Sequence, residues 1–114
     1  MVNNAMQAAW DAFKIYKTLP LAKRASLLRT IATEIEALGP DLISVCMSET
    51  NLPEARLLGE RARTIFQLTS YADACESGRW LEASIDTANT NRVPVKPDLR
   101  KMKVPLGPVI VFGA

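Results

Sequence analysis

Few side chains in this 114-residue sequence have the type and spacing that catalysis requires. The sequence contains no histidine, which excludes histidine general bases, histidine-dependent triads and histidine metal sites from it. Its two cysteines, Cys46 and Cys75, lie far apart in helix-like contexts and form no CxxC motif. We therefore expect both thiols to be buried, with neither a disulfide bond nor a catalytic role.

The acidic side chains form no pair suited to acid–base catalysis. They are spread around predicted helix ends and surfaces, at Glu34, Glu36, Glu49 and Glu54. A further polar group recurs on one face of a predicted helix, and its members are Arg56, Glu60, Arg63 and Gln67. We interpret this face as solvated and supported by ion pairs between successive turns. The alternative is that Glu60 and Arg61 or Arg63 pair with another part of a larger protein.

The clearest sign of a ligand site is the apolar run Val109–Phe112, which leads into Gly113 and Ala114. Elsewhere the glycines form neither GxGxxG nor a P-loop. A continuous Val/Ile/Phe run bounded by glycine and proline is typical of a strand buried on both faces of a parallel α/β sheet. Such a strand needs a crossover, usually a helix, before its neighbour. We therefore expect the chain to be a fragment of a larger α/β protein, with residues 105–114 as the first strand of a truncated nucleotide-binding sheet.

The part before this strand is predicted to be mostly α-helical, with about four helices between Asn3 and Gly78. Proline and glycine mark their ends at Pro20, Gly39-Pro40 and Gly78, and Asn51 is expected to cap the start of the fourth helix. Spacing places six side chains of the second helix inward: Leu21, Leu27, Leu28, Ile31, Ile35 and Leu38. In the fourth helix the inward stripe is Ala55, Leu58, Ala62, Ile65, Leu68 or Thr69, and Ala72.

Residues 79–104 predict a β arm, made of a weak strand near Trp80–Asp86 and a second strand over Leu99–Val104, joined by a loop rich in proline and asparagine. An isolated two-stranded ribbon is only marginally stable in water, so the arm needs a partner sheet. The sequence thus divides into a helical part (1–78), a β arm for oligomerisation (79–104) and the first strand of the sheet (105–114).

Composition narrows the class of protein. Lysine and arginine total 14 and aspartate and glutamate 12, a net charge of +2 with both signs interspersed. This distribution lacks the basic stripe that nucleic-acid binding needs. No secretory signal is evident, and no apolar stretch approaches the ~20 residues that span a bilayer. We expect a cytoplasmic protein with neither a nucleic-acid nor a membrane partner.

Two motifs connect these predictions to a known family. Glu49–Thr64 read ETNLPEARLLGERART and are followed by Gln67-Leu68, and Pro105–Ala114 read PLGPVIVFGA. The segments Arg24–Ala32 and Lys96–Arg100 fit the same pattern. In this order and spacing the motifs resemble the N-terminal part of the aldehyde dehydrogenase superfamily, most closely its α-ketoglutaric semialdehyde (2,5-dioxovalerate) dehydrogenase branch. The likeness covers nearly the whole chain.

The resemblance implies an NAD- or NADP-dependent parent enzyme that oxidises a small aldehyde to the carboxylic acid. The partner sheet that the β arm needs comes either from another part of a larger chain or from another subunit, and we expect a homo-oligomer formed through the arm. The family's nucleophilic cysteine, its general-base glutamate and its oxyanion asparagine match no residue here, so the chain itself is expected to be inactive and to bind no cofactor. Phe112, Gly113 and Ala114 match the strand end that borders the cofactor cleft. The alternative function is a stand-alone helical protein-interaction module with a β arm.

Overall fold

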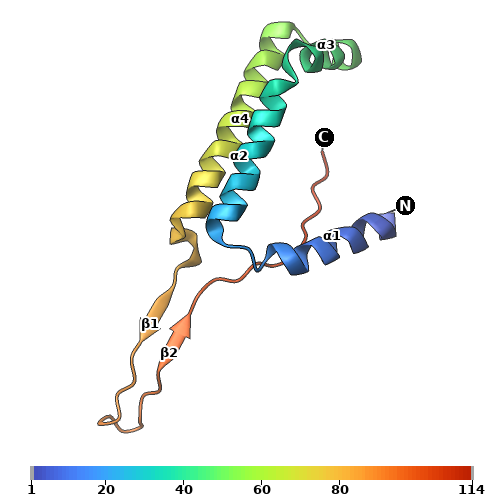
Figure 1. Cartoon of the computed structure of the whole chain (residues 1–114). Helices are drawn as coiled ribbons and strands as arrows, with labels where there is room; N and C mark the ends of the chain where they lie inside the picture. The colour runs from blue at the N-terminus through green and yellow to red at the C-terminus, as the bar shows by residue number, and fades with distance from the viewer. Residues whose placement is uncertain (1, 114) are drawn as a thin grey trace. The chain divides into compact units, whose positions relative to one another are not determined.

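A computed structural model describes residues 2–113, which form four α-helices and a two-stranded hairpin (Figure 1). The helices are α1 (Val2–Tyr16), α2 (Leu21–Ala37), α3 (Gly39–Thr50) and α4 (Glu54–Ser77). A short 3₁₀ helix, η1 (Arg79–Leu81), precedes the strands β1 (Ser84–Asp86) and β2 (Leu99–Lys101). The four predicted helices and the hairpin are therefore confirmed, although Trp80 lies in η1 rather than in a strand.

Local sequence explains most helix ends. Gly39 has φ +55°, which permits the sharp turn out of α2, and Pro40 occupies the first turn of α3. Gly78 follows α4 with φ +66°. Asn51 corrects a prediction, because it adopts the left-handed conformation (φ 56°) and ends α3 instead of capping α4. Its backbone N–H donates to Met47 O at 2.9 Å.

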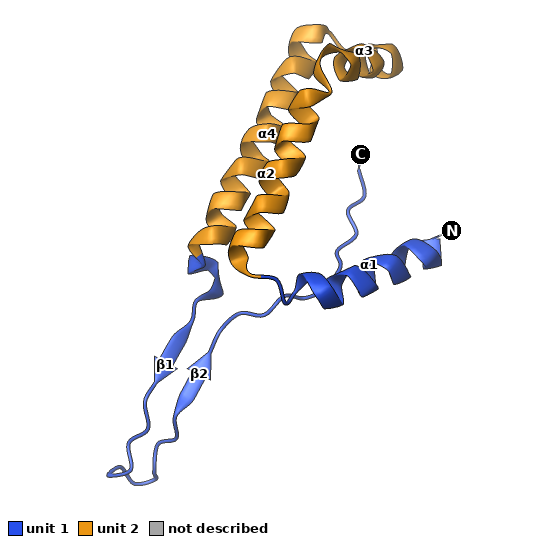
Figure 2. Ribbon diagram, in the orientation of Figure 1, with its two compact units in different colours: residues 1–19, 78–114 blue, residues 20–77 orange. Residues whose placement is uncertain are grey.

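The chain divides into two compact units, residues 20–77 and residues 1–19 with 78–114 (Figure 2). In the first unit α2 and α4 lie side by side in opposite directions, and α3 packs on α4 (Figure 1). The fully or nearly fully buried residues of this unit are small or β-branched: Ala25, Ala32, Ile43 and Ala72. Small side chains let the two long helices approach closely along their length.

The predicted inward faces of α2 and α4 are only partly correct. On α4 the half-buried or buried positions are Leu57, Arg61, Ile65, Leu68, Ala72 and Cys75, whereas Ala55, Leu58 and Ala62 are exposed. Leu27 and Ile31 of α2, and Leu38 directly after it, were also predicted to face inward and are likewise exposed. A helix that packs on one neighbour buries only one stripe, so apolar residues beside that stripe remain in contact with solvent.

The second unit contains α1 and the hairpin. β1 and β2 pair antiparallel, with Ile85 opposite Arg100. The ladder extends beyond the strands through a bridge between Asn89 and Lys96 and through Lys103 N–H, which donates to Leu81 O at 2.8 Å. Ion pairs from Lys96 to Asp86 and from Lys103 to Glu82 join the two sides of the hairpin.

The strand expected within residues 105–114 does not form in this structure. Residues 102–113 contain neither helix nor strand. A strand is defined by hydrogen bonds to a neighbour, and β1 and β2 already pair with each other. Val109, Val111 and Phe112 are 76%, 86% and 90% exposed, so most of the surface of this apolar run is uncovered by the described residues.

Candidate functional site

The predicted cofactor-binding residues lie at the end of the described chain. Phe112 is 90% exposed, and a β-carbon placed on Gly113 would meet nothing within 4 Å. Ala114 lies outside the described residues. The backbone at Phe112 and Gly113 is thus open enough for a ligand to approach, but these two residues alone enclose none. Their role in cofactor binding stays a prediction.

The segment just before them contacts α1. A hollow of about 380 Å³ is lined by residues of α1 and of the Gly107–Val109 segment, namely Ala9, Ala12, Phe13, Tyr16, Gly107, Pro108 and Val109. Trp10 and Phe13 pack with ring centroids 5.6 Å apart, and the Lys17 ammonium lies 5.4 Å from the Phe13 ring centre. An aromatic pair with a cation over one ring is a favourable arrangement. The helical spacing of residues in α1 does not reveal the segment that they contact, because that segment lies at the other end of the sequence.

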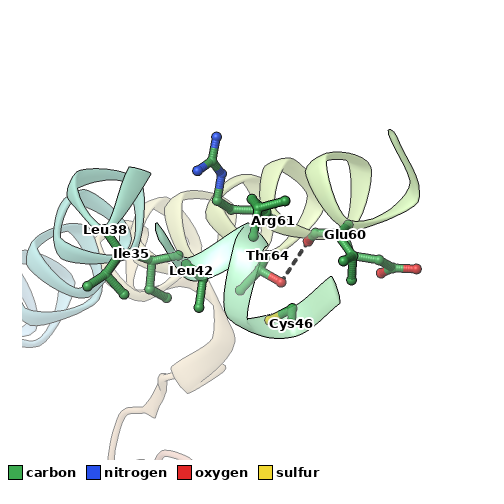
Figure 3. A pocket seen from close by; sticks show the side chains of 9 residues that line it. Ile35, Leu38, Leu42, Cys46, Glu60, Arg61 and Thr64 are labelled. Atoms are coloured by element: carbon green, nitrogen blue, oxygen red, sulfur yellow. Dashed lines mark hydrogen bonds between the residues drawn. The ribbon is translucent and has the colours of Figure 1, made fainter. Parts of the chain in front are cut away.

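A second hollow, of about 360 Å³, lies among α2, α3 and α4 (Figure 3). Its lining is Ile35, Leu38, Leu42, Ile43, Cys46, Leu57, Glu60, Arg61 and Thr64. The polar members are engaged elsewhere: Arg61 Nη1 donates to Gly39 O at 2.7 Å, and Thr64 Oγ1 donates to Glu60 O at 2.9 Å. Figure 3 shows the Arg61 guanidinium pointing away from Leu42 and Cys46. This hollow therefore presents an apolar interior and no acid–base pair.

Side chains of α4 form ion pairs of two kinds, and only the first lies within the predicted polar face. Arg56 Nε lies 3.2 Å from Glu60 Oε1 one turn away, as expected for a solvated helix face. The sequence did not predict the contacts of Arg29, whose Nη2 lies 2.7 Å from both Asp73 Oδ1 and Glu76 Oε2 and so joins α2 to α4. These two carboxylates accept hydrogen bonds that raise the pKa of Arg29 further.

On α1, Asp11 accepts hydrogen bonds from Gln7 Nε2 at 2.9 Å and from Lys14 Nζ at 2.8 Å. These bonds lower the pKa of Asp11 below its usual value, because they favour the charged carboxylate. All three side chains lie on the exposed surface of one helix, so this cluster stabilises α1 and does not resemble a catalytic centre.

The remaining candidate chemistry is also limited. Neither Cys46 nor Cys75 takes part in a disulfide bond within residues 2–113, and both are half-buried rather than fully buried as expected. The same residues contain no cluster of three or more His, Cys, Asp or Glu side chains that could hold a metal ion. None of the helices in the described range is both long and apolar enough to cross a membrane.

Comparison with known proteins assigns this chain to a family. A family model described as "Aldehyde dehydrogenase family" matches residues 1–113. Alpha-ketoglutaric semialdehyde dehydrogenase 2 of Azospirillum brasilense is 53% identical over 114 residues. Alpha-ketoglutaric semialdehyde dehydrogenase of Acinetobacter baylyi is 44% identical over 114 residues. Each alignment covers 99% of this chain and 22% of the relative, so the chain spans about a fifth of the length of these curated relatives.

The family match extends over nearly the whole chain, from the first helix to the PLGPVIVFGA segment. The chain therefore belongs to the aldehyde dehydrogenase family, and its parent fold is the α/β fold of that family. Enzymes of this family generally use NAD or NADP.

Proposed function

We propose that this chain is the N-terminal part of an NAD(P)-dependent aldehyde dehydrogenase that oxidises α-ketoglutaric semialdehyde or a related small aldehyde. The observation that carries the proposal is the 53% identity to the A. brasilense enzyme along essentially the entire chain. The resemblance of Glu49–Thr64 and Pro105–Ala114 to the family motifs supports it. The family match over residues 1–113 argues against the alternative of a stand-alone interaction module.

The overall reaction converts an aldehyde, water and NAD(P)⁺ into a carboxylate, NAD(P)H and protons. A bound NAD(P)⁺, bordered by Phe112, Gly113 and Ala114, would supply the acceptor for the two electrons that leave the aldehyde carbon as a hydride. The covalent step needs a cysteine nucleophile, and release of the acid needs a base for water. Neither Cys46 nor Cys75 matches the family's nucleophile motif, so we assign these steps to residues outside this chain and expect the 114-residue chain alone to be inactive.

Within the proposed enzyme, residues 109–112 form the first strand of the cofactor sheet. Phe112, Gly113 and Ala114 then border the nicotinamide side of the cleft, beyond the carboxyl end of the strand. The open surroundings of Gly113 and the exposure of Phe112 are compatible with close approach of a ligand to this backbone. No catalytic step is assigned to these residues; they shape the border of the cleft.

The hairpin supplies the proposed oligomer contact. Ile85, Val95 and Leu99 are 67%, 61% and 52% exposed, and a two-stranded ribbon of this size is marginal by itself. Pairing with a sheet of a second subunit satisfies the outer strand edges and covers these side chains.

The proposal also includes a cytoplasmic location, because cysteines without disulfides suit a reducing compartment.

A chimera tests the proposed function. The segment of the A. brasilense enzyme that aligns with this chain is replaced by residues 1–114, and NADH and NADPH formation is measured with α-ketoglutaric semialdehyde and with propionaldehyde. We expect a rate constant within about tenfold of the intact enzyme, equivalent to about 1.4 kcal/mol in the barrier. The matched control carries Phe112→Glu, which places a charge in the proposed sheet and should abolish activity.

The result is decisive in both directions. A chimera that folds and oxidises the aldehyde supports the proposal. A chimera that produces no NAD(P)H contradicts it, whether it is folded or not, because the proposal requires these residues to pack in the cofactor domain of that enzyme.

A further inference from the structure

One point of contact stands out in the C-terminal part of the chain. Between residues 97 and 113 every described residue is exposed except Gly107 and Pro108, which are half-buried. Among the described residues of α1, only Phe13 and Tyr16 are half-buried. These four residues line the same hollow, so the burial of each pair reflects contact between α1 and the Gly107–Pro108 turn.

The turn has the shape that glycine permits. Gly107 has φ +125°, a backbone conformation that residues with a side chain rarely adopt. A β-carbon built on Gly107 would lie 3.6 Å from Trp10 Cζ3, which is ordinary van der Waals contact. An alanine here is therefore opposed by the backbone angle and not by a clash, and the Trp10 ring lies directly beside the turn. The ring of Pro108 then fixes its own φ at about −65°.

We propose that Trp10 and Gly107 form a positioning contact, termed the α1 dock, which fixes where and in which direction the segment Val109–Phe112 begins. The ladder of the hairpin ends at the bond from Lys103 N–H to Leu81 O, before the turn. Beyond the turn, Val111 and Phe112 are almost fully exposed. The dock is thus the last contact before the segment, and it sets the direction from which a sheet can take up the strand.

The inference deepens the proposed function, because it takes residues 109–112 to be the first strand of the cofactor sheet. Trp10 is a positioning residue and not a catalytic one: it acts on Phe112 and Gly113 through the turn. Trp10 suits this role because its broad, rigid ring packs against Phe13 on one helix face while 48% of its surface remains exposed.

Nuclear magnetic resonance of the 114-residue chain tests the dock directly. We expect a nuclear Overhauser effect between Trp10 Hζ3 and Gly107 Hα, and a ring-current shift of Gly107 Hα. The shift should be lost in the Trp10→Ala variant and largely retained in the Trp10→Phe variant, because a smaller aromatic ring still faces the turn. Val109 amide order, measured by heteronuclear relaxation, should fall with Trp10→Ala while that of Arg100 in the hairpin stays unchanged.

Tryptophan fluorescence compares two glycine variants, Gly107→Ala and its control Gly113→Ala. In a Trp80→Phe background, Trp10 is the only tryptophan. Gly107→Ala should raise acrylamide quenching of Trp10, but by less than about twofold, because 48% of the residue is already exposed in the docked state and its contact with Phe13 remains. Gly113→Ala should leave quenching unchanged, because nothing lies within 4 Å of that site.

The dock is refuted if the Trp10–Gly107 Overhauser effect is absent in the unmodified chain, or if the two glycine variants quench equally. None of these measurements involves cofactor or turnover. An inactive chimera with the dock intact therefore rejects the proposed function alone, and an active chimera without the Overhauser effect rejects the dock alone.

Discussion

Replacing Ala72 with leucine gives a quantitative test of how α4 packs on α2. Ala72 is 0% exposed, so an added isopropyl group has no free space to enter. Overpacking of this kind costs about 1–3 kcal/mol, and a value near 2 kcal/mol corresponds to a factor of about 30 in the unfolding equilibrium. In urea, with a slope of about 1–3 kcal/mol per molar for small domains, the midpoint should fall by about 1 M.

The matched control is Ala62→Leu on the same helix. Ala62 is exposed, so this substitution should change the free energy of unfolding by no more than about 0.5 kcal/mol. Helical spacing in the sequence placed both alanines inward and so predicts similar costs for the two variants. Urea unfolding of the 114-residue chain, followed by circular dichroism, separates these cases. Equal shifts for Ala72→Leu and Ala62→Leu would show that the face of α4 described above is wrong.

Two further predictions concern electrostatics. Arg29→Ala should lower the urea midpoint by less than Ala72→Leu does, because the ion pairs of Arg29 with the α4 carboxylates are solvent-exposed. The decrease in midpoint should be smaller in about 1 M salt, which screens these ion pairs. The control is Arg63→Ala, on the exposed side of α4. The lowered pKa of Asp11 stabilises α1 at pH values above its usual pKa of 3.8, and this contribution is lost as the pH falls through the lowered pKa. Helicity of α1, measured by amide chemical shifts, should therefore drop on acidification, and Asp11→Asn should remove that dependence; a profile identical in both proteins would contradict the prediction.

The sequence predicted those parts of the fold that depend on local chemistry. Proline and glycine act on the backbone within a residue or two, so Pro20, Gly39-Pro40 and Gly78 marked the helix ends correctly. The face of α4 depended on a distant partner instead. Arg61 is half-buried and donates to Gly39 O, a residue 22 positions away. Because an arginine is normally exposed, the spacing of apolar residues in the sequence predicts an inward stripe through Ala55, Leu58 and Ala62 instead.

The candidate site was predictable to a smaller degree. The PLGPVIVFGA motif identified the segment and its family, but a strand forms only against a neighbour, and none is available among the described residues. The contact between Trp10 and Gly107 could not be predicted from spacing, since it joins residues at opposite ends of the sequence. The sequence gives one indication of this contact, which is the Gly107-Pro108 pair immediately before the apolar run. Such a pair indicates a turn, but it does not identify the residue that packs against the turn.

The exposed apolar residues of the long helices have a common physical meaning. Leu27 and Ile31 of α2 are 45% and 39% exposed, and Leu38 directly after α2 is 55% exposed. On α4, Leu58 and Phe66 are 40% and 70% exposed. Two helices that pack on each other bury one stripe each, yet both sequences carry wider apolar faces than this single contact uses. Helical spacing in the sequence marks apolar positions without regard to which neighbour covers them, whereas the structure shows only the faces that α2 and α4 cover mutually. The apolar surface that remains exposed on α2 and α4 can pack against further structure. The proposed place of this chain in a cofactor domain requires such additional packing.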